Sequence, residues 1–408
     1  MSQTSHHAPD IVVTSMNDLP GHEVEEVLGA DDHLDGIRVT IVGGGIGGLA
    51  VAVALRQLGA LVTVFERAPQ LEPLGAGLSL WPNAVRALRS LRVADAIETA
   101  EVPRGEGGLW RWDGAPLATQ DADEIASRFG APLVLVHRGE VQQALSGALD
   151  AGTIVLGETL RTLEQDDAGI RATFESGRVA EADILVGADG LHSTTRAALI
   201  GDGPPRYSGL IAHRAVVEHP APETAGEFWG EHGVFGLVPL SQGRVYWYAT
   251  HRSDDPDIRD DKDRLLDRLA TWIEPIPQVV ERTPAADILR HPLFDRRPCR
   301  GWSVGRATLV GDAAHPMLPF LGQGACQAIE DAVALRDELG WAVPISDALR
   351  AYEERRYRRV TMLVKRSRAA GRVAHLSAGW QRAARDAALR HTPARLQRRQ
   401  LDATIGLR

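Results

Sequence analysis

The stretch IRVTIVGGGIGGLA, residues 37–50, constrains the fold of this chain more than any other part of it. Gly43, Gly45 and Gly48 have the spacing of a phosphate-binding turn between a strand and a helix. Gly43 allows the tight turn, Gly45 lets the backbone approach a pyrophosphate, and Gly48 lets the helix pack on the strand. The helix N-terminus then faces the phosphates with its free N–H groups. The stretch therefore predicts a nucleotide cofactor.

The segments around this turn predict one βαβ unit, with strands at 37–42 and 61–65 and a helix at 46–58. Glu66 stands at the end of the second strand, 18 residues after Gly48. There a carboxylate can accept hydrogen bonds from both ribose hydroxyls of an adenosine. This pattern fits the adenosine half of either NAD or FAD.

Two later segments favour FAD over NAD. The run 307–312 predicts a strand that ends at Asp312, whose carboxylate can accept a hydrogen bond from a ribityl hydroxyl. The turn 322–324 precedes a helix predicted over 324–340, so its N–H groups suit the electron-rich edge of a reduced flavin. A third strand and turn are predicted at 183–190. An enzyme that uses only a nicotinamide has no need of the second site.

Composition excludes several classes of protein. A chain of 408 residues suggests two or three structural units. Two cysteines, Cys299 and Cys326, cannot build a disulfide framework or a cysteine-rich metal site. His6 and His7 stand without other ligands, so we expect no metal. No apolar run reaches the length of a membrane span, and no basic segment precedes an apolar one at the N-terminus. We therefore expect a cytoplasmic protein.

Charge is distributed unevenly along the chain. Residues 1–36 carry eight carboxylates and no Lys or Arg, and their lack of periodicity predicts a disordered acidic leader. Residues 350–408 carry sixteen Lys and Arg against four acids. Basic segments can bind nucleic acid or an anionic surface. Because no nucleic-acid module accompanies them, we interpret these arginines as solvated helix faces and expect no nucleic-acid partner.

Three separated motifs give the chain a clear family resemblance over residues 36–370. They are GxGxxG with Glu66-Arg67, then GADGLHSTTR from residue 187, then GDAAHPMLPFLGQGACQAIEDA from residue 311. In this order and spacing the chain resembles the single-component, class A FAD-dependent monooxygenases of the p-hydroxybenzoate hydroxylase fold. Within that group it is similar to the salicylate hydroxylase and urate hydroxylase branch.

The resemblance implies an α/β fold with a Rossmann-like FAD-binding domain of the GR2 type, assembled from discontinuous segments. An antiparallel β-sheet substrate domain is inserted, since 206–297 alternates aromatic and apolar residues around a Ser-Gln-Gly turn. The expected FAD-binding segments are 37–103, 131–205 and 298–345, the substrate segments are 104–130 and 206–297, and the C-terminal Arg-rich helices are 346–408.

The resemblance also assigns residues to non-covalently bound FAD. Gly47 and Gly48 are expected at the pyrophosphate together with Arg138, Glu66 and Arg67 at the adenosine ribose, and Leu160 at the adenine edge. Ser79 is expected on the flavin side, Asp312 at the ribityl chain, and Asp189 in a motif shared by FAD and the passing NAD(P)H. The remaining expected contacts, at the pyrimidine end of the flavin, are Gly322, Gln323, Gly324, Ala325 and Cys326.

The reaction that the resemblance implies is hydroxylation. NADH or NADPH reduces FAD, O2 adds to form a C4a-hydroperoxide, and one oxygen passes to an aromatic or polycyclic small molecule. Two alternatives stay open. One is an epoxidase or antibiotic-modifying monooxygenase of the same fold, and the other is an FAD-holding redox scaffold without turnover. The sequence leaves open whether the protein is a monomer or a homodimer.

The substrate site leaves fewer signals. His213 is a candidate base and Arg214 a candidate catalytic residue, but neighbours on a strand point to opposite faces, so one of them must face away. Urate-hydroxylating relatives use an Asn and an Arg in this region, where the matching stretches of this chain have Ala212 and Gly233-Val234, which disfavours a purine. The candidates for lining the substrate pocket are Phe235, Leu237, Pro319 and Phe320.

Two other reactive side chains have structural interpretations. Cys326 is interpreted as a small buried helix residue and not as a redox-active thiol. His315 could anchor a flavin covalently or act as a base, but its place in the third motif favours a structural hydrogen-bonding histidine.

Overall fold

The computed structural model describes residues 33–71, 77–98, 106–166, 169–231, 233–258, 261–341 and 343–406, all within one compact unit. The predicted acidic leader lies outside these residues except for its last four, and His6 and His7 also lie outside them. The predicted disorder of the leader therefore stays a prediction.

The glycine turn belongs to a parallel sheet of five strands, in the order β17-β11-β1-β2-β7. The strands are β1 (Arg38–Val42), β2 (Leu61–Glu66), β7 (Ile154–Leu156), β11 (Ile184–Gly187) and β17 (Ala307–Leu309). Residues of β1 and β11 are buried on both faces, which explains why these strands are continuous apolar runs in the sequence. The strands predicted around the three motifs are confirmed, with ends that differ by a few residues.

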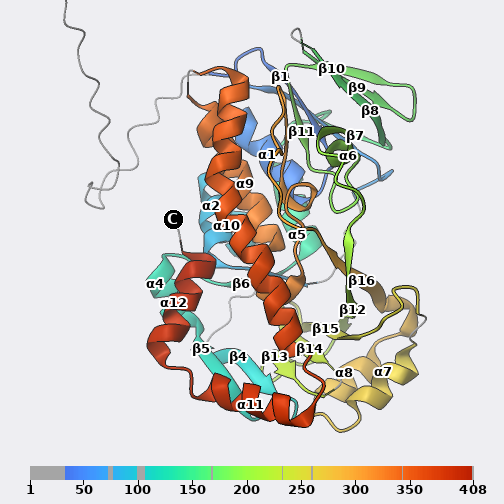
Figure 1. Ribbon diagram of the computed structural model, residues 1–408, viewed down its shortest axis with the longest axis vertical. Helices are drawn as coiled ribbons and strands as arrows, with labels where there is room; N and C mark the ends of the chain where they lie inside the picture. Colours follow the sequence, from blue (N-terminus) through green and yellow to red (C-terminus); the bar gives the residue numbers. More distant parts are fainter. Residues whose placement is uncertain are drawn as a thin grey trace, which may run out of the picture. The chain divides into compact units, whose positions relative to one another are not determined.

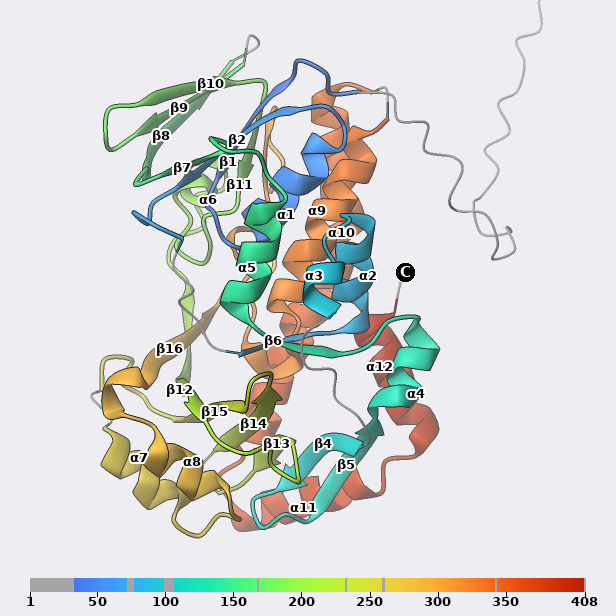
Figure 2. The ribbon, with the colours of Figure 1, turned by 180° about the vertical axis from the view of Figure 1, so that it is seen from behind.

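The two faces of this sheet carry different layers (Figures 1 and 2). Val39, Ile41 and Val64 pack on the helical layer, and Val42 and Phe65 pack on a small antiparallel sheet. The alternation of strand side chains separates the two sets. The helices of the first layer include α1 (Ile46–Arg56), α5 (Arg138–Gly147) and α9 (Gly324–Leu339), and the small sheet has the order β10-β9-β8, with β8 (Leu160–Gln165), β9 (Ile170–Phe174) and β10 (Val179–Ala182).

A second sheet of seven strands has the order β16-β12-β15-β14-β13-β4-β5. Its strands are β4 (Glu106–Arg111), β5 (Pro116–Asp121), β12 (Arg206–Glu218), β13 (Gly226–Trp229), β14 (Val234–Leu240), β15 (Arg244–Arg252) and β16 (Leu289–Asp295). The predicted Ser-Gln-Gly turn joins β14 to β15, with positive φ at Gln242 (63°) and Gly243 (68°). Helices α7 (Lys262–Leu269) and α8 (Ile276–Arg282) cover one face of this sheet (Figure 2).

A two-stranded antiparallel pair connects the two large sheets. It consists of β3 (Gly77–Leu80) and β6 (Val134–His137). Leu135 of β6 packs on Leu240 and Tyr246 of the seven-stranded sheet. The remaining short helices are α2 (Pro82–Ser90), α3 (Asp95–Glu98), α4 (Ala122–Phe129) and α6 (Thr194–Leu199).

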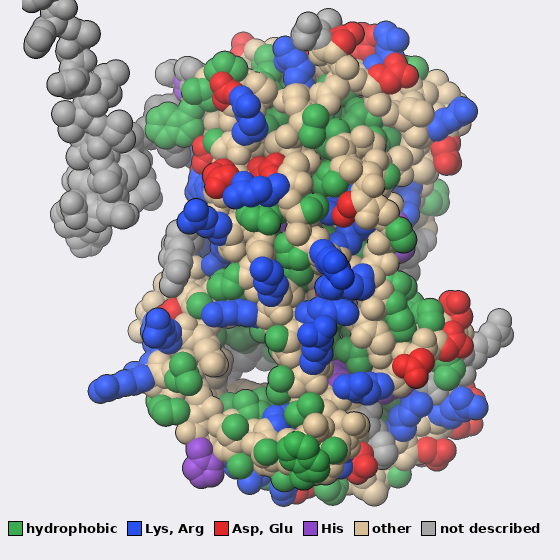
Figure 3. All heavy atoms as spheres, in the orientation of Figure 1, with side chains coloured by type: hydrophobic (Ala, Val, Ile, Leu, Met, Phe, Trp, Pro, Cys, Tyr) green, Lys and Arg blue, Asp and Glu red, His purple; other side chains and the backbone are tan. Residues whose placement is uncertain are grey.

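The C-terminal segment is helical, as predicted, in α10 (Ile345–Ala374), α11 (Gly379–Arg390) and α12 (Ala394–Ile405). Helix α10 begins beside α9 and runs to the seven-stranded sheet (Figure 1), where His375 Nε2 lies 2.9 Å from Thr250 Oγ1. Many of its basic side chains are exposed and gather over α10 (Figure 3). The interpretation of the arginines as solvated is wrong for Arg356 and Arg385, which are buried. No helix in the described residues has the length and apolar character needed to cross a bilayer.

Candidate functional site

The glycine turn has the close approaches that the sequence predicts. Gly43 has a φ of +109°, and a Cβ there would lie 2.4 Å from the carbonyl oxygen of Ala188. A Cβ on Gly48 would lie 1.9 Å from the carbonyl oxygen of Gly43. Gly45, in contrast, has nothing within 4 Å of its Cβ position. Two of the glycines are thus required by packing, whereas Gly45 borders open space in front of the helix.

Glu66 lies directly beside this turn. Its carboxylate accepts hydrogen bonds from the N–H groups of Gly44, at 2.6 Å, and Ala68, at 2.9 Å. These two bonds hold the side chain at the carboxyl end of β2, next to the N-terminus of α1. A carboxylate has further lone pairs, so Glu66 keeps acceptor capacity for a ribose hydroxyl.

Two helices present uncapped N-termini at this edge of the parallel sheet. Helix α1 begins after Gly45 and α9 after Gln323, and neither helix has a side-chain cap. The first N–H groups of a helix have no partner within the helix. A Cβ on Gly324 would meet nothing within 4 Å, so the space before α9 is also open. This edge therefore offers two sets of backbone donors, as a dinucleotide with a flavin requires.

Asp312 lies in the short turn Gly311–Ala313, which follows β17 and precedes α9 in the sequence. Its side chain is accessible to solvent but is surrounded by protein, and burial raises the pKa of its carboxyl. His315 and Arg138 act against that shift. The binding of one cofactor by Asp312 and Arg138 stays a prediction.

Asp189 of the second motif contacts the start of α6. Its carboxylate accepts hydrogen bonds from the Ser193 hydroxyl and from the N–H of Thr195, at 2.9 Å, and so holds the start of α6. Arg196, which is 1% exposed, donates to the carbonyl oxygens of Ala313 and Ala314, at 2.8 and 2.7 Å. The second motif therefore supports the Asp312 turn from behind.

A buried charge network stands behind the two helix ends, and the sequence reasoning missed it. Arg356 of α10 donates to Asp331, at 2.7 Å, and to Glu330, also at 2.7 Å. Asp331 in turn accepts from the N–H of Gly311, at 2.8 Å, and its Oδ2 lies 2.6 Å from His315 Nε2. Arg356 and Arg359 lower the pKa of Glu330 to about 2, and His315 together with Arg356 lowers the pKa of Asp331 to about 2, although burial alone would raise both values.

This network fixes the turn that carries Asp312 against α9 and α10. It also explains His315, which is buried and bonded as a structural histidine. The signal in the sequence was two adjacent acids, Glu330 and Asp331, inside an otherwise apolar helix.

The other expected cofactor residues lie along the same edge. Arg67 is exposed directly after β2, and Leu160 is buried in one cluster with Val42 and Phe65. A Cβ on Gly47 would lie 3.2 Å from the Cβ of Ala328 in α9. Cys326 is fully buried, with its Sγ 3.7 Å from the carbonyl oxygen of Ser79. Burial raises the pKa of this thiol to about 12, so it stays neutral.

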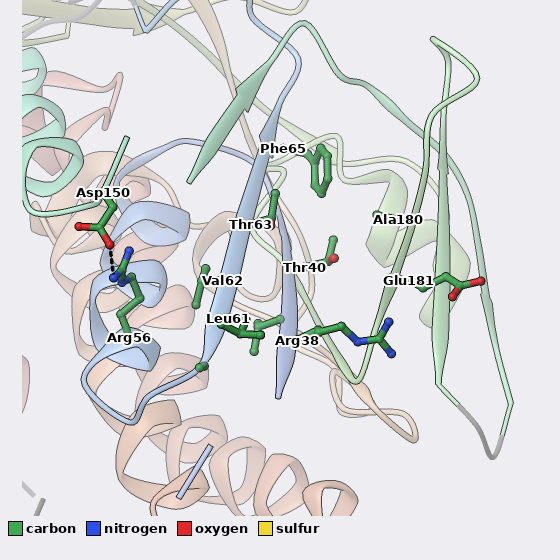
Figure 4. Close-up of a pocket in the computed structure, with 12 residues that line it drawn as sticks. Arg38, Thr40, Arg56, Leu61, Val62, Thr63, Phe65, Asp150, Ala180 and Glu181 are labelled. Atoms are coloured by element: carbon green, nitrogen blue, oxygen red, sulfur yellow. Dashed lines mark ion pairs between the residues drawn. The ribbon is translucent and has the colours of Figure 1, made fainter. Parts of the chain in front are cut away.

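A surface groove of about 380 Å³ lies at the opposite end of the parallel sheet (Figure 4). It is lined by Arg38 and Thr40 of β1, by Thr63 of β2 and by Glu181 of β10, and the Arg56–Asp150 ion pair lies at its border. These residues are at the start of the strands, whereas the glycine turn is at their carboxyl ends. No expected cofactor residue lines the groove, so we assign it no part in the site.

His213 points away from the cofactor region. It stacks on His251, with ring centroids 5.4 Å apart. It also points to the same face of the sheet as Ala215, which packs under α7 and α8. His251 itself lines a small cavity with Leu265 and Trp272. The interpretation of His213 as a substrate base is therefore wrong, because the side chain lies on the covered face of the sheet.

Phe235 and Leu237 need the same correction. Both are 0% exposed and belong to the core between the seven-stranded sheet and α7 and α8, where Phe235 stacks on Trp247. Pro319 is exposed and Phe320 is half-buried, in the turn Pro319–Leu321 before α9. These two remain candidates for the pocket because that turn leads directly into the N-terminus of α9.

Arg214 lies on the other face, as its strand position requires. It influences the pKa values of Tyr246 and His291, so its guanidinium lies near both. A Cβ on Gly77 of β3 would touch the Tyr246 ring at 2.5 Å, so this face meets the β3–β6 pair. Because β3 also carries Ser79, the face with Arg214 is the one toward the cofactor region.

Comparison with known proteins extends this picture beyond the motifs. Residues 36–367 match the family described as FAD binding domain. The aurachin C monooxygenase/isomerase of Stigmatella aurantiaca is 39% identical over 346 residues, 83% of this chain and 90% of that protein. A 3-amino-4-hydroxybenzoate 2-monooxygenase of Streptomyces platensis is 39% identical over 362 residues, 86% of this chain and 91% of that protein.

Among solved structures, Klebsiella pneumoniae HpxO complexed with FAD and uric acid has a TM-score of 0.83 and 29% sequence identity. The similarity covers 91% of this chain and 97% of that chain. The similarity therefore extends far beyond the glycine turn.

Proposed function

This chain belongs to the FAD binding domain family and is a flavoprotein monooxygenase, and we propose that it uses NADH or NADPH and O2 to hydroxylate an aromatic or polycyclic small molecule. One observation carries the proposal. One edge of the parallel sheet carries two uncapped helix N-termini together with Glu66 and Asp312. The face of the seven-stranded sheet with Arg214 lies toward that edge.

The residues of this edge fit FAD. Gly45 and the start of α1 would receive the pyrophosphate, with Glu66 at the ribose and Asp312 at the ribityl chain. The N–H groups before α9 would face the pyrimidine end of the flavin, where they stabilise negative charge. The bound flavin, once reduced, would supply the electrons that activate O2, and the transferred oxygen atom would come from that O2.

The protein itself positions the two reactants and keeps them away from water. The Arg356 network holds the Asp312 turn and the start of α9 rigidly. The sheet face with Arg214 would hold the substrate, and the β3–β6 pair closes the space on one side. Exclusion of water matters because an activated oxygen species that meets solvent is lost as hydrogen peroxide.

Aromatic substrates are supported by the relatives, which are named for aurachin C and for 3-amino-4-hydroxybenzoate. The test is a screen of phenols, aminophenols and quinolones with the purified holoenzyme. NADH and NADPH consumption is followed in air, and products are analysed by mass spectrometry with isotopically labelled O2. We expect one labelled atom in the product, matched to the reductant consumed. Oxygen that arrives from water, or hydrogen peroxide as the sole product, would contradict hydroxylation.

A further inference from the structure

The two faces of the seven-stranded sheet differ in what covers them. Phe228 and Trp247 are buried in the core under α7 and α8. On the opposite face, Tyr246 packs on Leu135 of the β3–β6 pair, and Thr250 contacts His375 at the end of α10. The side chains between these two coverings are the ones that can meet a substrate.

One row of residues crosses this face between the two coverings. Arg214 of β12 pairs with Tyr248 of β15, Tyr248 pairs with Gly236 of β14, and Gly236 pairs with Glu227 of β13. Strands lie about 4.8 Å apart, so the row spans roughly 14 Å from Arg214 to Glu227. It thus has a cation at one end and a carboxylate at the other.

Exposure separates this row from its neighbour. The adjacent row on the same face consists of Ala212, Thr250, Val234 and Trp229, all of which are buried under the end of α10 and the turn before α9. Arg214, Tyr248 and Glu227 are each partly exposed. Figure 3 shows an opening in the surface beside α10, on the side of this sheet. The polar row is therefore less covered than its neighbour.

Gly236 allows the Tyr248 ring to reach the Glu227 carboxylate. A Cβ at this position would lie 1.9 Å from Cε1 of Tyr248, so the phenol ring can lie across the strand only because Gly236 has no side chain. The ring thereby reaches the next strand, where its hydroxyl donates to Glu227 at 2.6 Å. The Trp229 indole N–H donates to the other carboxylate oxygen.

Glu227 is hydrogen-bonded to two neutral donors, the Tyr248 hydroxyl and the Trp229 indole N–H. Among the described residues no Lys, Arg or His forms an ion pair with it, and burial raises the pKa of its carboxyl although the residue as a whole is partly exposed. A carboxylate has about four acceptor sites, of which Tyr248 and Trp229 use two. In the part of the chain that the structure describes, no other hydrogen bond to the remaining sites is seen.

We propose that Glu227, held by Tyr248 and Trp229, is a substrate-binding residue that accepts a hydrogen bond from an amino, ring N–H or hydroxyl group of the aromatic substrate. This inference rests on the proposed function, because it names the substrate class of the same site. It predicts that the enzyme selects substrates with a donor at the end of the ring system distant from Arg214. A substrate with a carboxylate at that end would be rejected by charge.

The experiment compares matched ligands that differ in one donor. The first pair is 3-amino-4-hydroxybenzoate and 3-methyl-4-hydroxybenzoate, and the second is 4-hydroxyquinoline and 4-methoxyquinoline. Dissociation constants are measured with the holoenzyme from the change in flavin absorbance, and KM and kcat are measured for each ligand that turns over. The ratio of the dissociation constants within a pair is the quantity of interest, because general damage to the protein affects both members equally.

We expect the wild-type enzyme to prefer the donor-bearing member of at least one pair by about tenfold or more, since a hydrogen bond to a charged group is worth this much. Glu227→Gln should abolish most of that preference, mainly in KM, and Glu227→Asp should restore part of it. Tyr248→Phe should reduce the preference less. Glu231→Gln is the control, because Glu231 is an exposed acid four residues away that pairs with Arg382.

Two results would overturn the inference. One is a wild-type enzyme that shows no preference within either pair, and the other is a Glu227→Gln variant with the wild-type ratio and a full complement of FAD. Failure of the proposed function is a separate result, since it would appear as an absence of labelled oxygen in every product while the ligand preference in binding persists.

Discussion

The sheet edge proposed to bind the cofactor and the sheet face proposed to bind the substrate offer different parts of the chain to a ligand. At the edge of the parallel sheet, the groups on offer are mainly backbone N–H donors at the starts of α1 and α9, with glycines that leave room in front of them. On the seven-stranded sheet, the groups are the side chains of Arg214, Tyr248 and Glu227. A site built from backbone N–H groups requires glycines at a fixed spacing. A site built from side chains requires only that the residues point to the same face of the sheet.

The two regions also differ in how they are made rigid. Behind the cofactor edge, Arg356 crosses from α10 to Glu330 and Asp331, so a buried ion network fixes the Asp312 turn. On the substrate face, one glycine and one phenol fix the Glu227 carboxylate. The first arrangement joins α9, α10 and the Asp312 turn, whereas the second positions one side chain on a sheet face.

The largest expected effect is on stability in the cofactor region. Arg356→Met leaves Glu330 and Asp331 buried with fewer cations, and the loss of one partner from a buried pair costs about 3–5 kcal/mol. We expect this loss in the free energy of unfolding from denaturant titrations. Arg358→Met is the control, because Arg358 is exposed on the same helix. A loss below about 1 kcal/mol for Arg356→Met would show that the network does not hold this region together.

The contrast between the regions explains what the sequence could predict. The order of strands and helices around Gly43, Asp189 and Asp312 followed from spacing alone, because glycine turns and strand ends leave a fixed pattern. The hairpin around Gln242 was predicted for the same reason. The expected cofactor residues lie along one edge, although Asp189 turns inward to hold α6.

The residues that face the substrate could not be predicted, because the sequence does not show which face of the seven-stranded sheet is covered by helices. His213, Phe235 and Leu237 occupy strands of the expected sheet, but α7 and α8 cover the face to which they point. Glu227 escaped notice for the converse reason. It shares a face with Trp229, and only the pairing of β13 with β14 brings it to Tyr248.

The second prediction tests whether the open space beside Gly324 is where the flavin binds. Gly324→Val meets no atom of the protein, so the fold should persist, but the new side chain would fill the space before α9. Loss of such donor contacts typically costs about 10²–10³ in rate, so we expect turnover to fall by that factor. Gly147→Val, at the end of α5 and also without near neighbours, should leave turnover unchanged. Wild-type turnover in Gly324→Val would place the flavin elsewhere.

The third prediction concerns the affinity for FAD. Asp312→Ala removes a charged acceptor from the cofactor edge, and a hydrogen bond to a charged group contributes about 1.5–3 kcal/mol, or about 10- to 150-fold in affinity. The dissociation constant is measured by titrating apoprotein with FAD. Asp347→Ala, an exposed acid on α10, serves as the control. Retention of FAD with wild-type affinity would mean that Asp312 does not bind the ribityl chain.

The smallest expected effect is a pH dependence of stability that belongs to the cofactor region alone. The pKa values of Glu330 and Asp331 are about 2 in the folded protein, below their usual values. Depressed carboxyl pKa values stabilise the folded state above the unfolded pKa, and that stability is lost as the pH falls toward the folded pKa. Between pH 7 and pH 4 the two groups together should account for about 1 kcal/mol of lost stability, because only the unfolded chain takes up protons there. Denaturant titrations across this range should therefore show a shallower decline in the double variant Glu330→Gln, Asp331→Asn, even though that variant is less stable at pH 7. Glu227→Gln on the substrate face should leave the difference between the two curves unchanged, and equal slopes for wild type and double variant would show that the buried acids are not ionised at neutral pH.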